Sequence, residues 1–209
     1  KNLSNFNYKF ISTGGTYKKI KKLGYKCLEV SKLTGFNEIL EGRVKTLHHK
    51  IHAALLYKKD NKKHLKEVNK AKIFNIEMVV VNLYPFENFY KKNNHEKTIE
   101  MIDIGGVSLL RSSSKNFKYI TTVSQIDDYS SLIDNIKKNS GKTDINFRKK
   151  LASKAFDKTS SYDDLISKWL DININRNRFD LKYGENENQK SYLVKRPSFD
   201  ISKYKVNGK

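Results

Sequence analysis

The chain of 209 residues lacks the features by which several protein classes are recognised. It holds one cysteine, Cys27, which excludes an internal disulfide framework and a metal site built from several cysteines. Its two prolines, Pro85 and Pro197, exclude a proline-rich linker. No apolar run approaches the roughly 20 residues that a membrane helix needs, and the first residues hold no apolar core typical of a signal peptide. We therefore expect a soluble, cytoplasmic protein without a membrane partner.

Arginine is also scarce, although the chain is strongly basic. Lysine and arginine total 42 against 22 acidic residues, which gives a net charge of +20, yet only six of the cations are arginines. Arginine is the residue that forks onto phosphates and guanines, and the lysines are spread along the whole chain. Lysine, asparagine, isoleucine and tyrosine share AT-rich codons, so a biased genome explains this composition. We expect no specific nucleic-acid partner, and keep a basic nucleic-acid-binding protein as an alternative.

Strand-like and helix-like segments alternate along the chain. This alternation predicts an α/β fold with a mostly parallel sheet flanked by helices. Segment 77–86 is almost continuously apolar, so we expect a strand buried on both faces. From Asp171 onward the sequence is polar and irregular, and we interpret it as a linker. The other expected strands are 8–12, 25–31 and 118–124, and the expected helices are 17–23, 59–72, 95–102, 107–116, 126–138, 143–157 and 159–170.

The first candidate site follows the first expected strand. Ser12, Thr13, Gly14, Gly15 and Thr16 combine hydroxyls with a flexible backbone ahead of a helix. Backbone N–H groups at a helix start point toward an anion, so this segment suits a phosphate. An ordinary strand-to-helix turn is the alternative.

The second candidate is a basic segment. Arg43 and Lys45 are two positions apart, and Thr46 adds a hydroxyl. In an extended segment, side chains two positions apart share a face, where two cations suit a phosphate or a developing oxyanion. A solvated basic loop is the alternative.

Three histidines, His48, His49 and His52, resemble metal ligands. No suitably spaced carboxylate accompanies them, so we expect no metal.

A third candidate lies at the end of the strongest strand. Asn82 and Tyr84 are polar residues at its carboxyl end, where ligands gather in parallel α/β sheets. The alternative is a strand end stabilised by an asparagine turn.

The fourth candidate surrounds an expected helix. Asp103 precedes it and could act as a base, and the N–H groups that follow could stabilise an oxyanion. Lys115 ends the helix and could be a catalytic cation. The alternatives are a helix-capping aspartate and a lysine that interacts with the helix dipole.

Five sequence blocks, in the same order along the chain, resemble one family. They resemble the IMP cyclohydrolase domain of the bifunctional purine-biosynthesis enzyme, which pairs it with an AICAR transformylase. The similarity spans about residues 3–170, and the tail 180–189 resembles the opening motif of the transformylase domain. The blocks are STGGT (12–16), TGFNEILEGRVKTLHHKIH (34–52), MVVVNLYPF (78–86), IDIGGVSLLRSSSKN (102–116) and KAFDKTSSYD (154–163).

The resemblance implies a methylglyoxal-synthase-like α/β domain that forms a homodimer. The implied reaction closes formamidoimidazole carboxamide ribotide (FAICAR) to IMP with loss of water, the work of a hydrolase acting on a cyclic amidine. Cyclisation needs no cofactor; 10-formyltetrahydrofolate serves only the transformylase. Residues 1–170 would form the cyclohydrolase-like domain without its first strand. Residues 171–209 would be a linker and the start of a truncated transformylase domain, whose core is absent, so we expect no transformylase activity.

The resemblance also implies residue roles. The catalytic residues would be Lys45, Tyr84, Asp103 and Lys115. Asp103 and Lys115 can meet across a bend at Gly105-Gly106, by the long Lys115 side chain reaching back, or across a dimer interface; we expect the bend, and otherwise the dimer. The substrate-binding residues would be Ser12, Thr13, Gly15, Thr16, Arg43, Thr46, Asn82, Ile104 and Gly105.

Several departures from the family pattern leave other readings open. The family's phosphate-contacting lysine near the first strand is absent, His49 stands where the family has proline, and Phe117 where it has histidine. Glu187 and Asn188 replace a Pro-His pair in the tail. One alternative is a methylglyoxal-synthase-like phosphate lyase. Another is a non-catalytic remnant of the domain that only binds nucleotides or dimerises.

Overall fold

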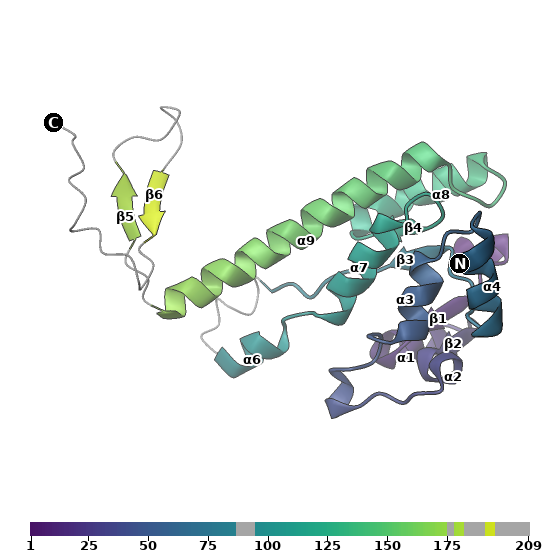
Figure 1. Ribbon diagram of the computed structural model, residues 1–209, viewed down its shortest axis with the longest axis horizontal. Helices are drawn as coiled ribbons and strands as arrows, with labels where there is room; N and C mark the ends of the chain where they lie inside the picture. The colour runs from purple at the N-terminus through teal and green to yellow at the C-terminus, as the bar shows by residue number, and fades with distance from the viewer. Residues whose placement is uncertain (87–94, 175–177, 182–190, 195–209) are drawn as a thin grey trace. The chain divides into compact units, whose positions relative to one another are not determined.

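The computed structural model describes residues 1–86, 95–174, 178–181 and 191–194, and the chain divides into two compact units, 1–163 and 164–209. The first unit contains two pairs of short strands with helices between them (Figure 1). Both pairs are parallel, which confirms the expected α/β fold with parallel strands. The strands are β1 (Phe10–Ser12) with β2 (Cys27–Glu29), and β3 (Met78–Val80) with β4 (Thr121–Val123).

The described helices follow most of the expected segments. The histidine-rich segment forms a helix that the sequence analysis missed. Residues 143–157 and 159–170, expected as two helices, belong to one continuous helix. The helices are α1 (Gly14–Lys22), α2 (Val30–Thr34), α3 (His49–Leu56), α4 (Lys62–Lys70), α6 (His95–Glu100), α7 (Gly105–Lys115), α8 (Tyr129–Lys138) and α9 (Ile145–Ile174), with 3₁₀ turns η1 (Leu3–Phe6), η2 (Leu40–Gly42) and η3 (Ile126–Asp128).

Apolar side chains from the strands and helices form two core clusters. The first joins α2, α3 and β3 through Val30, Ile51, Leu55 and Val79. The second packs β4 against α8 and α9, and its members are Val123, Leu132, Ile136 and Leu151. Since Val79 of β3 and Val123 of β4 belong to these clusters, burial of apolar area holds the β3–β4 pair to its helices.

One edge of β3 has no neighbouring strand among the described residues. The amide of Val81 donates to Val123, and the carbonyl of Glu77 accepts from Thr121, so the backbone groups on either side of β3 face β4. Backbone groups alternate in direction along a strand, so those of Val80 face away from β4. The Val80 side chain is 44% exposed, so the expectation of burial on both faces is wrong at this position.

Strands β1 and β3 both line the same cleft. At the start of both strands, burial and then the Glu77 carboxylate raise the pKa of Tyr8. At their ends, Ser12 and Asn82 line the cleft together. The strand pairs are thus separated by a cleft rather than joined by hydrogen bonds in the part of the chain that the structure describes.

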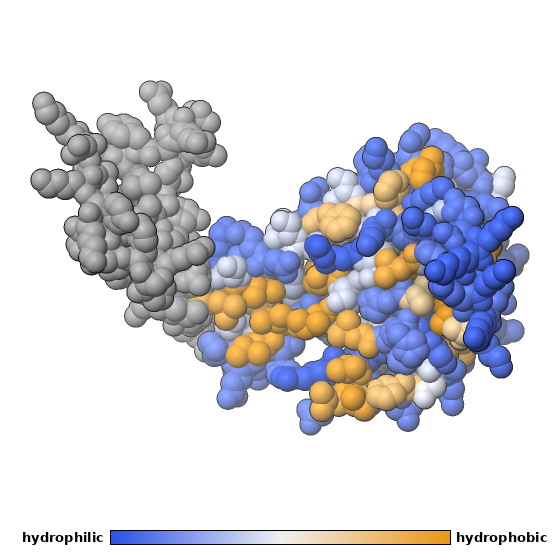
Figure 2. Space-filling model, in the orientation of Figure 1, coloured by the Kyte–Doolittle hydropathy of each residue, from blue (hydrophilic) through white to orange (hydrophobic). Residues whose placement is uncertain are grey.

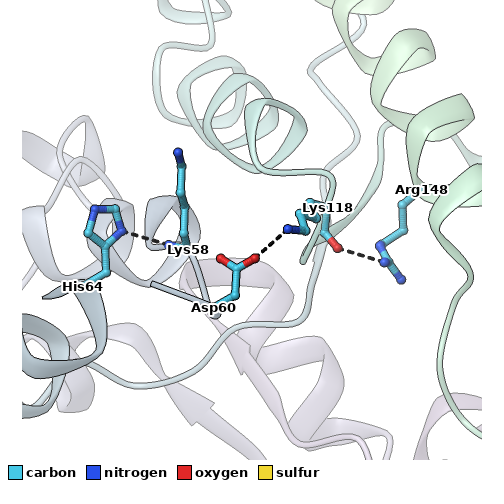
Figure 3. A network of polar contacts seen from close by, with 5 residues as sticks. All are labelled: Lys58, Asp60, His64, Lys118 and Arg148. Carbon is cyan, nitrogen blue, oxygen red and sulfur yellow. Dashed lines mark hydrogen bonds and ion pairs between the residues drawn. The ribbon is translucent and has the colours of Figure 1, made fainter. Parts of the chain in front are cut away.

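Polar contacts fix the loop after α7 (Figure 3). Lys118 forms an ion pair with Asp60, at 2.5 Å, and its carbonyl accepts a hydrogen bond from Arg148 of α9. The buried Asn116 side chain donates to the carbonyls of Leu55 and Tyr57 at the end of α3. These bonds satisfy carbonyls that a helix end leaves free, and they hold the far end of α7 against α3.

The second unit differs from the expected irregular linker. Helix α9 continues to Ile174, and β5 (Arg178–Leu181) pairs with β6 (Ser191–Val194) in antiparallel fashion. The motif at 182–189 lies outside the described residues. The expected domain boundary at 170 falls a few residues after the division between the units.

Hydrophilic side chains cover much of the coloured surface in Figure 2, with hydrophobic patches between them. Several large apolar residues are exposed near the basic segment, among them Phe36, Ile39, Leu40 and Leu47. Among the described helices, none is both long and apolar enough to cross a membrane.

Candidate active site

An open cleft of about 1880 Å³ in the first unit collects most of the expected site residues. It exceeds the roughly 300–1,000 Å³ of an ordinary small-molecule pocket. All expected site residues line it except Gly15 and Lys115. The residues that line it are Ser12, Thr13, Thr16, Arg43, Lys45, Thr46, Asn82, Tyr84, Asp103, Ile104 and Gly105.

The start of α1 forms one end of the cleft. Thr13 is the extended residue ahead of the helix, and Gly14 begins it with a φ of 50°. This left-handed conformation favours glycine, since other residues adopt it at a cost. The turn directs backbone N–H groups of the first helical residues outward, as anion binding requires.

Lys45 reaches the start of α1. A Cβ placed on Gly14 would lie 3.8 Å from the Lys45 Nζ, and one placed on Gly42 would lie 3.3 Å from it. The Lys45 side chain is half-buried and forms no ion pair among the described residues. An ammonium group without a carboxylate partner thus lies beside helix N–H groups, where both attract an anion.

Arg43, the other cation of the segment, is paired. Its Nε donates to Oε2 of Glu100 at 3.1 Å, and its Nη2 bonds the second carboxylate oxygen. This contact raises the pKa of Arg43 and lowers the pKa of Glu100. Glu100 holds one edge of the guanidinium, and no described residue bonds Nη1, so that edge is left for a ligand.

Thr46 connects the basic segment to α7. A Cβ on Gly105 would lie 2.8 Å from the Thr46 Oγ1, closer than real side chains approach. Glycine at position 105 therefore permits the close approach of the two segments.

Asp103 caps α7 with one carboxylate oxygen. The amide of Gly106 donates to Asp103 Oδ1 at 2.6 Å, so the capping role weighed as an alternative is present. No hydrogen bond to Oδ2 occurs among the described residues. Oδ2 lies against Gly106, 2.5 Å from where a Cβ would begin on that residue, and Asp103 lines the cleft.

Asn82 and Tyr84 lie on the β3 side of the cleft. The Asn82 amide donates to the Tyr129 hydroxyl at 2.9 Å. Tyr84 is 53% exposed, so its ring is accessible from the cleft. The end of β3 thus contributes two polar side chains, as expected for the carboxyl end of a parallel strand.

Lys115 lies at the opposite end of α7 from Asp103. The helix has 11 residues and runs unbroken from Gly105, so its length is about 16 Å. The expected bend at Gly105-Gly106 is wrong, because both glycines belong to the first turn of α7. Within one chain, Lys115 is therefore not part of the cleft.

The histidines have contacts within the fold. His48 precedes α3 and accepts a hydrogen bond from the Lys50 amide at 3.2 Å. His52 Nδ1 lies 2.9 Å from the Ser112 hydroxyl, and burial lowers the pKa of His52. No cluster of three possible metal ligands occurs in the ranges that the structure describes.

Sequence reasoning missed three residues around this cleft. Glu100 and Tyr129 hold side chains that it had selected, and Tyr162 of α9 bonds the backbone on both sides of Ile102. Tyr162 belongs to the last of the five matching blocks, which was the one signal available for it.

The chain matches two family descriptions, "MGS-like domain" over residues 1–108 and "AICARFT/IMPCHase bienzyme" over residues 113–209. The Bifunctional purine biosynthesis protein PurH of Clostridium kluyveri is 45% identical over 196 residues, which cover 90% of this chain and 39% of that protein. PurH of Clostridium botulinum strain Langeland is 40% identical over 223 residues, with coverage of 99% and 44%. The chain thus spans about two fifths of the length of these relatives.

The solved structure of ForH shares the fold, with a TM-score of 0.69 over 81% of this chain and 87% of that one, at 24% identity. The PurH matches confirm the resemblance to the bifunctional purine-biosynthesis family. Since the MGS-like description covers more than half of the chain, this protein belongs to the family of MGS-like domains.

Proposed function

We propose that this chain is an IMP cyclohydrolase, which closes FAICAR to IMP with loss of water. The observation that carries the proposal is the position of the segment Arg43–Thr46. Lys45 approaches the start of α1, while Thr46 contacts the start of α7. Two helix starts, two cations and the Asp103 carboxylate therefore border one cleft.

The ribotide phosphate would bind at the α1 end. Backbone N–H groups and the hydroxyls of Ser12, Thr13 and Thr16 offer donors, and Lys45 adds a positive charge. The free edge of Arg43 offers a second cation. Such an anchor turns ring closure into a reaction between groups held close together.

Ring closure requires proton transfer and stabilisation of an oxyanion. The carboxamide nitrogen loses a proton and attacks the formyl carbon, whose oxygen becomes an alkoxide. The alkoxide takes up that proton and the proton of the formamide nitrogen, and it leaves as water while a C=N bond forms at the formamide nitrogen. We assign the first proton to the free oxygen of Asp103, and alkoxide stabilisation to Lys45, Tyr84 and the backbone of Ile104 and Gly105.

Lys115 enters the proposal through a second copy of the chain. It lies outside the cleft of its own chain, so it would reach the substrate only across a homodimer interface. The proposed ligand is a purine ribotide, without a cofactor for cyclisation, in the cytoplasm.

The test combines binding with turnover. Calorimetry with IMP should give saturable binding below millimolar concentration, and FAICAR should be converted to IMP. Lys45→Ala should weaken binding roughly ten- to a hundredfold, since one charge-assisted contact contributes about 1.5–3 kcal/mol. The control is Lys66→Ala, an equal loss of charge on the exposed face of α4. Equal binding by both variants would contradict the proposed site.

A non-catalytic remnant is the second candidate. The position of Lys115 outside the cleft favours it, because a single chain then lacks one of the four expected catalytic groups. IMP binding without FAICAR turnover, in protein shown to be folded and dimeric, would support the remnant over the enzyme.

A further inference from the structure

The backbone turn that carries Asp103 is tied to α9 by one side chain. The Tyr162 hydroxyl accepts a hydrogen bond from the Asp103 amide at 2.8 Å and donates one to the Met101 carbonyl at 2.8 Å. Both bonds are short and involve backbone groups on either side of Ile102. The hydroxyl therefore fixes the conformation of this turn at two points.

Tyr162 itself is held in place. It is 6% exposed, and its ring packs edge-on against Phe86, with the ring centroids 6.1 Å apart. Phe86 is 1% exposed and ends the segment that carries Asn82 and Tyr84. A buried ring with so little freedom can define the position of the groups that its hydroxyl bonds.

The side chain of Asp103 has a second anchor. Its Oδ1 accepts from Gly106, so the carboxylate orientation depends on where the backbone of Asp103 lies relative to α7. Tyr162 fixes the backbone of Asp103, and the start of α7 fixes the Gly106 amide that the carboxylate bonds. With both anchors in place, Oδ2 remains without a hydrogen bond among the described residues.

We infer that Tyr162 is a positioning residue that orients the Asp103 carboxylate toward the cleft. The inference rests on the proposed function, because it assigns to Tyr162 the placement of the proposed base. A phenylalanine would fill the same space and preserve the contact with Phe86. The hydroxyl thus acts on the turn, and its removal separates positioning from packing.

The main experiment is a double-mutant cycle with Tyr162→Phe and Asp103→Asn. Tyr162→Phe should lower kcat roughly tenfold and change KM little, because both hydrogen bonds that hold the turn are lost and the base is placed less precisely. In the Asp103→Asn background, the same substitution should lower kcat less than twofold. The control is Tyr57→Phe, which also removes a tyrosine hydroxyl, but one that bonds Asn75 rather than the turn of Asp103.

A second readout does not depend on turnover. The amide resonance of Gly106 reports its hydrogen bond to Asp103, and it should shift in Tyr162→Phe but not in Tyr57→Phe. An unchanged Gly106 resonance, or equal losses of kcat in both Asp103 backgrounds, would overturn the positioning role. An unmodified chain that neither binds IMP nor turns over FAICAR would refute the proposed function instead, while the Gly106 shift would still decide the role of Tyr162.

Discussion

The hydroxyl oxygen of Thr46 lies 2.8 Å from the position that a Cβ atom would take at Gly105. This distance is too short for any residue other than glycine at position 105. Two segments far apart in the sequence thus touch at the cleft. The contact predicts that the effect of Gly105→Ala on stability depends on the residue at position 46.

Gly105→Ala should destabilise the protein while Thr46 is present. Alanine in a helix is otherwise favoured over glycine by up to about 1 kcal/mol, so in a Thr46→Ala background the same substitution should be neutral or stabilising. Urea unfolding of the four proteins measures this. Destabilisation of equal size in both backgrounds would show that Thr46 is not the obstacle.

Lys115 and Asp103 predict recovery of activity by mixing. Lys115→Ala and Asp103→Asn should each lower ring closure roughly a hundredfold. If the site combines Asp103 of one chain with Lys115 of another, dimers exchanged between the two variants contain one intact site. Activity should return to about a quarter of the unsubstituted level at equal amounts of the variants. If activity does not recover although exchange of chains is confirmed, Asp103 and Lys115 do not form a shared site across the dimer interface.

The Asp60–Lys118 pair predicts a pH dependence of stability. Lys118, and then Tyr119, lower the pKa of Asp60 from 3.8 to about 2. The ionised form is favoured in the folded state, so the stabilisation is complete above about pH 4 and is lost as the pH falls toward 2. Asp60→Asn should lower the melting temperature slightly at pH 6 and leave it unchanged near pH 2, because exposed pairs contribute little. Asp127→Asn, at an exposed carboxylate without an ion pair among the described residues, is the control. A difference that persists at pH 2 would rule out ionisation of Asp60 as its cause.

The open edge of β3 predicts unequal hydrogen exchange within one strand. The Val79 amide faces β4, whereas the Val80 amide faces the cleft, so Val80 should exchange faster. An open strand edge can take up an added strand. A synthetic β-branched peptide flanked by lysines should slow exchange at Val80 roughly tenfold and leave Val79 unchanged. The same peptide with a central proline is the control, since proline cannot donate to the ladder. Equal slowing by both peptides would argue against strand pairing.

The sequence by itself determined the alternation of strands and helices, because apolar periodicity and glycine turns act over a few neighbouring residues. It also selected the segments Ser12–Thr16, Arg43–Thr46 and Asp103–Gly105, since phosphate binding and proton transfer require particular groups at short spacing. The family resemblance was equally a property of the sequence, and the comparisons confirm it.

Only the tertiary structure decided which of these groups share a cleft. Lys45 approaches Gly14, and Tyr162 bonds the turn of Asp103, through contacts between residues distant in the chain that no local pattern encodes. The continuity of α7 likewise separated Lys115 from Asp103, since a rigid helix fixes the distance between its ends. Burial was decided in the same way: Val80 is as apolar as Val79, yet Val80 is exposed because successive side chains of a strand point to opposite faces and only Val79 belongs to the core cluster with Val30, Ile51 and Leu55.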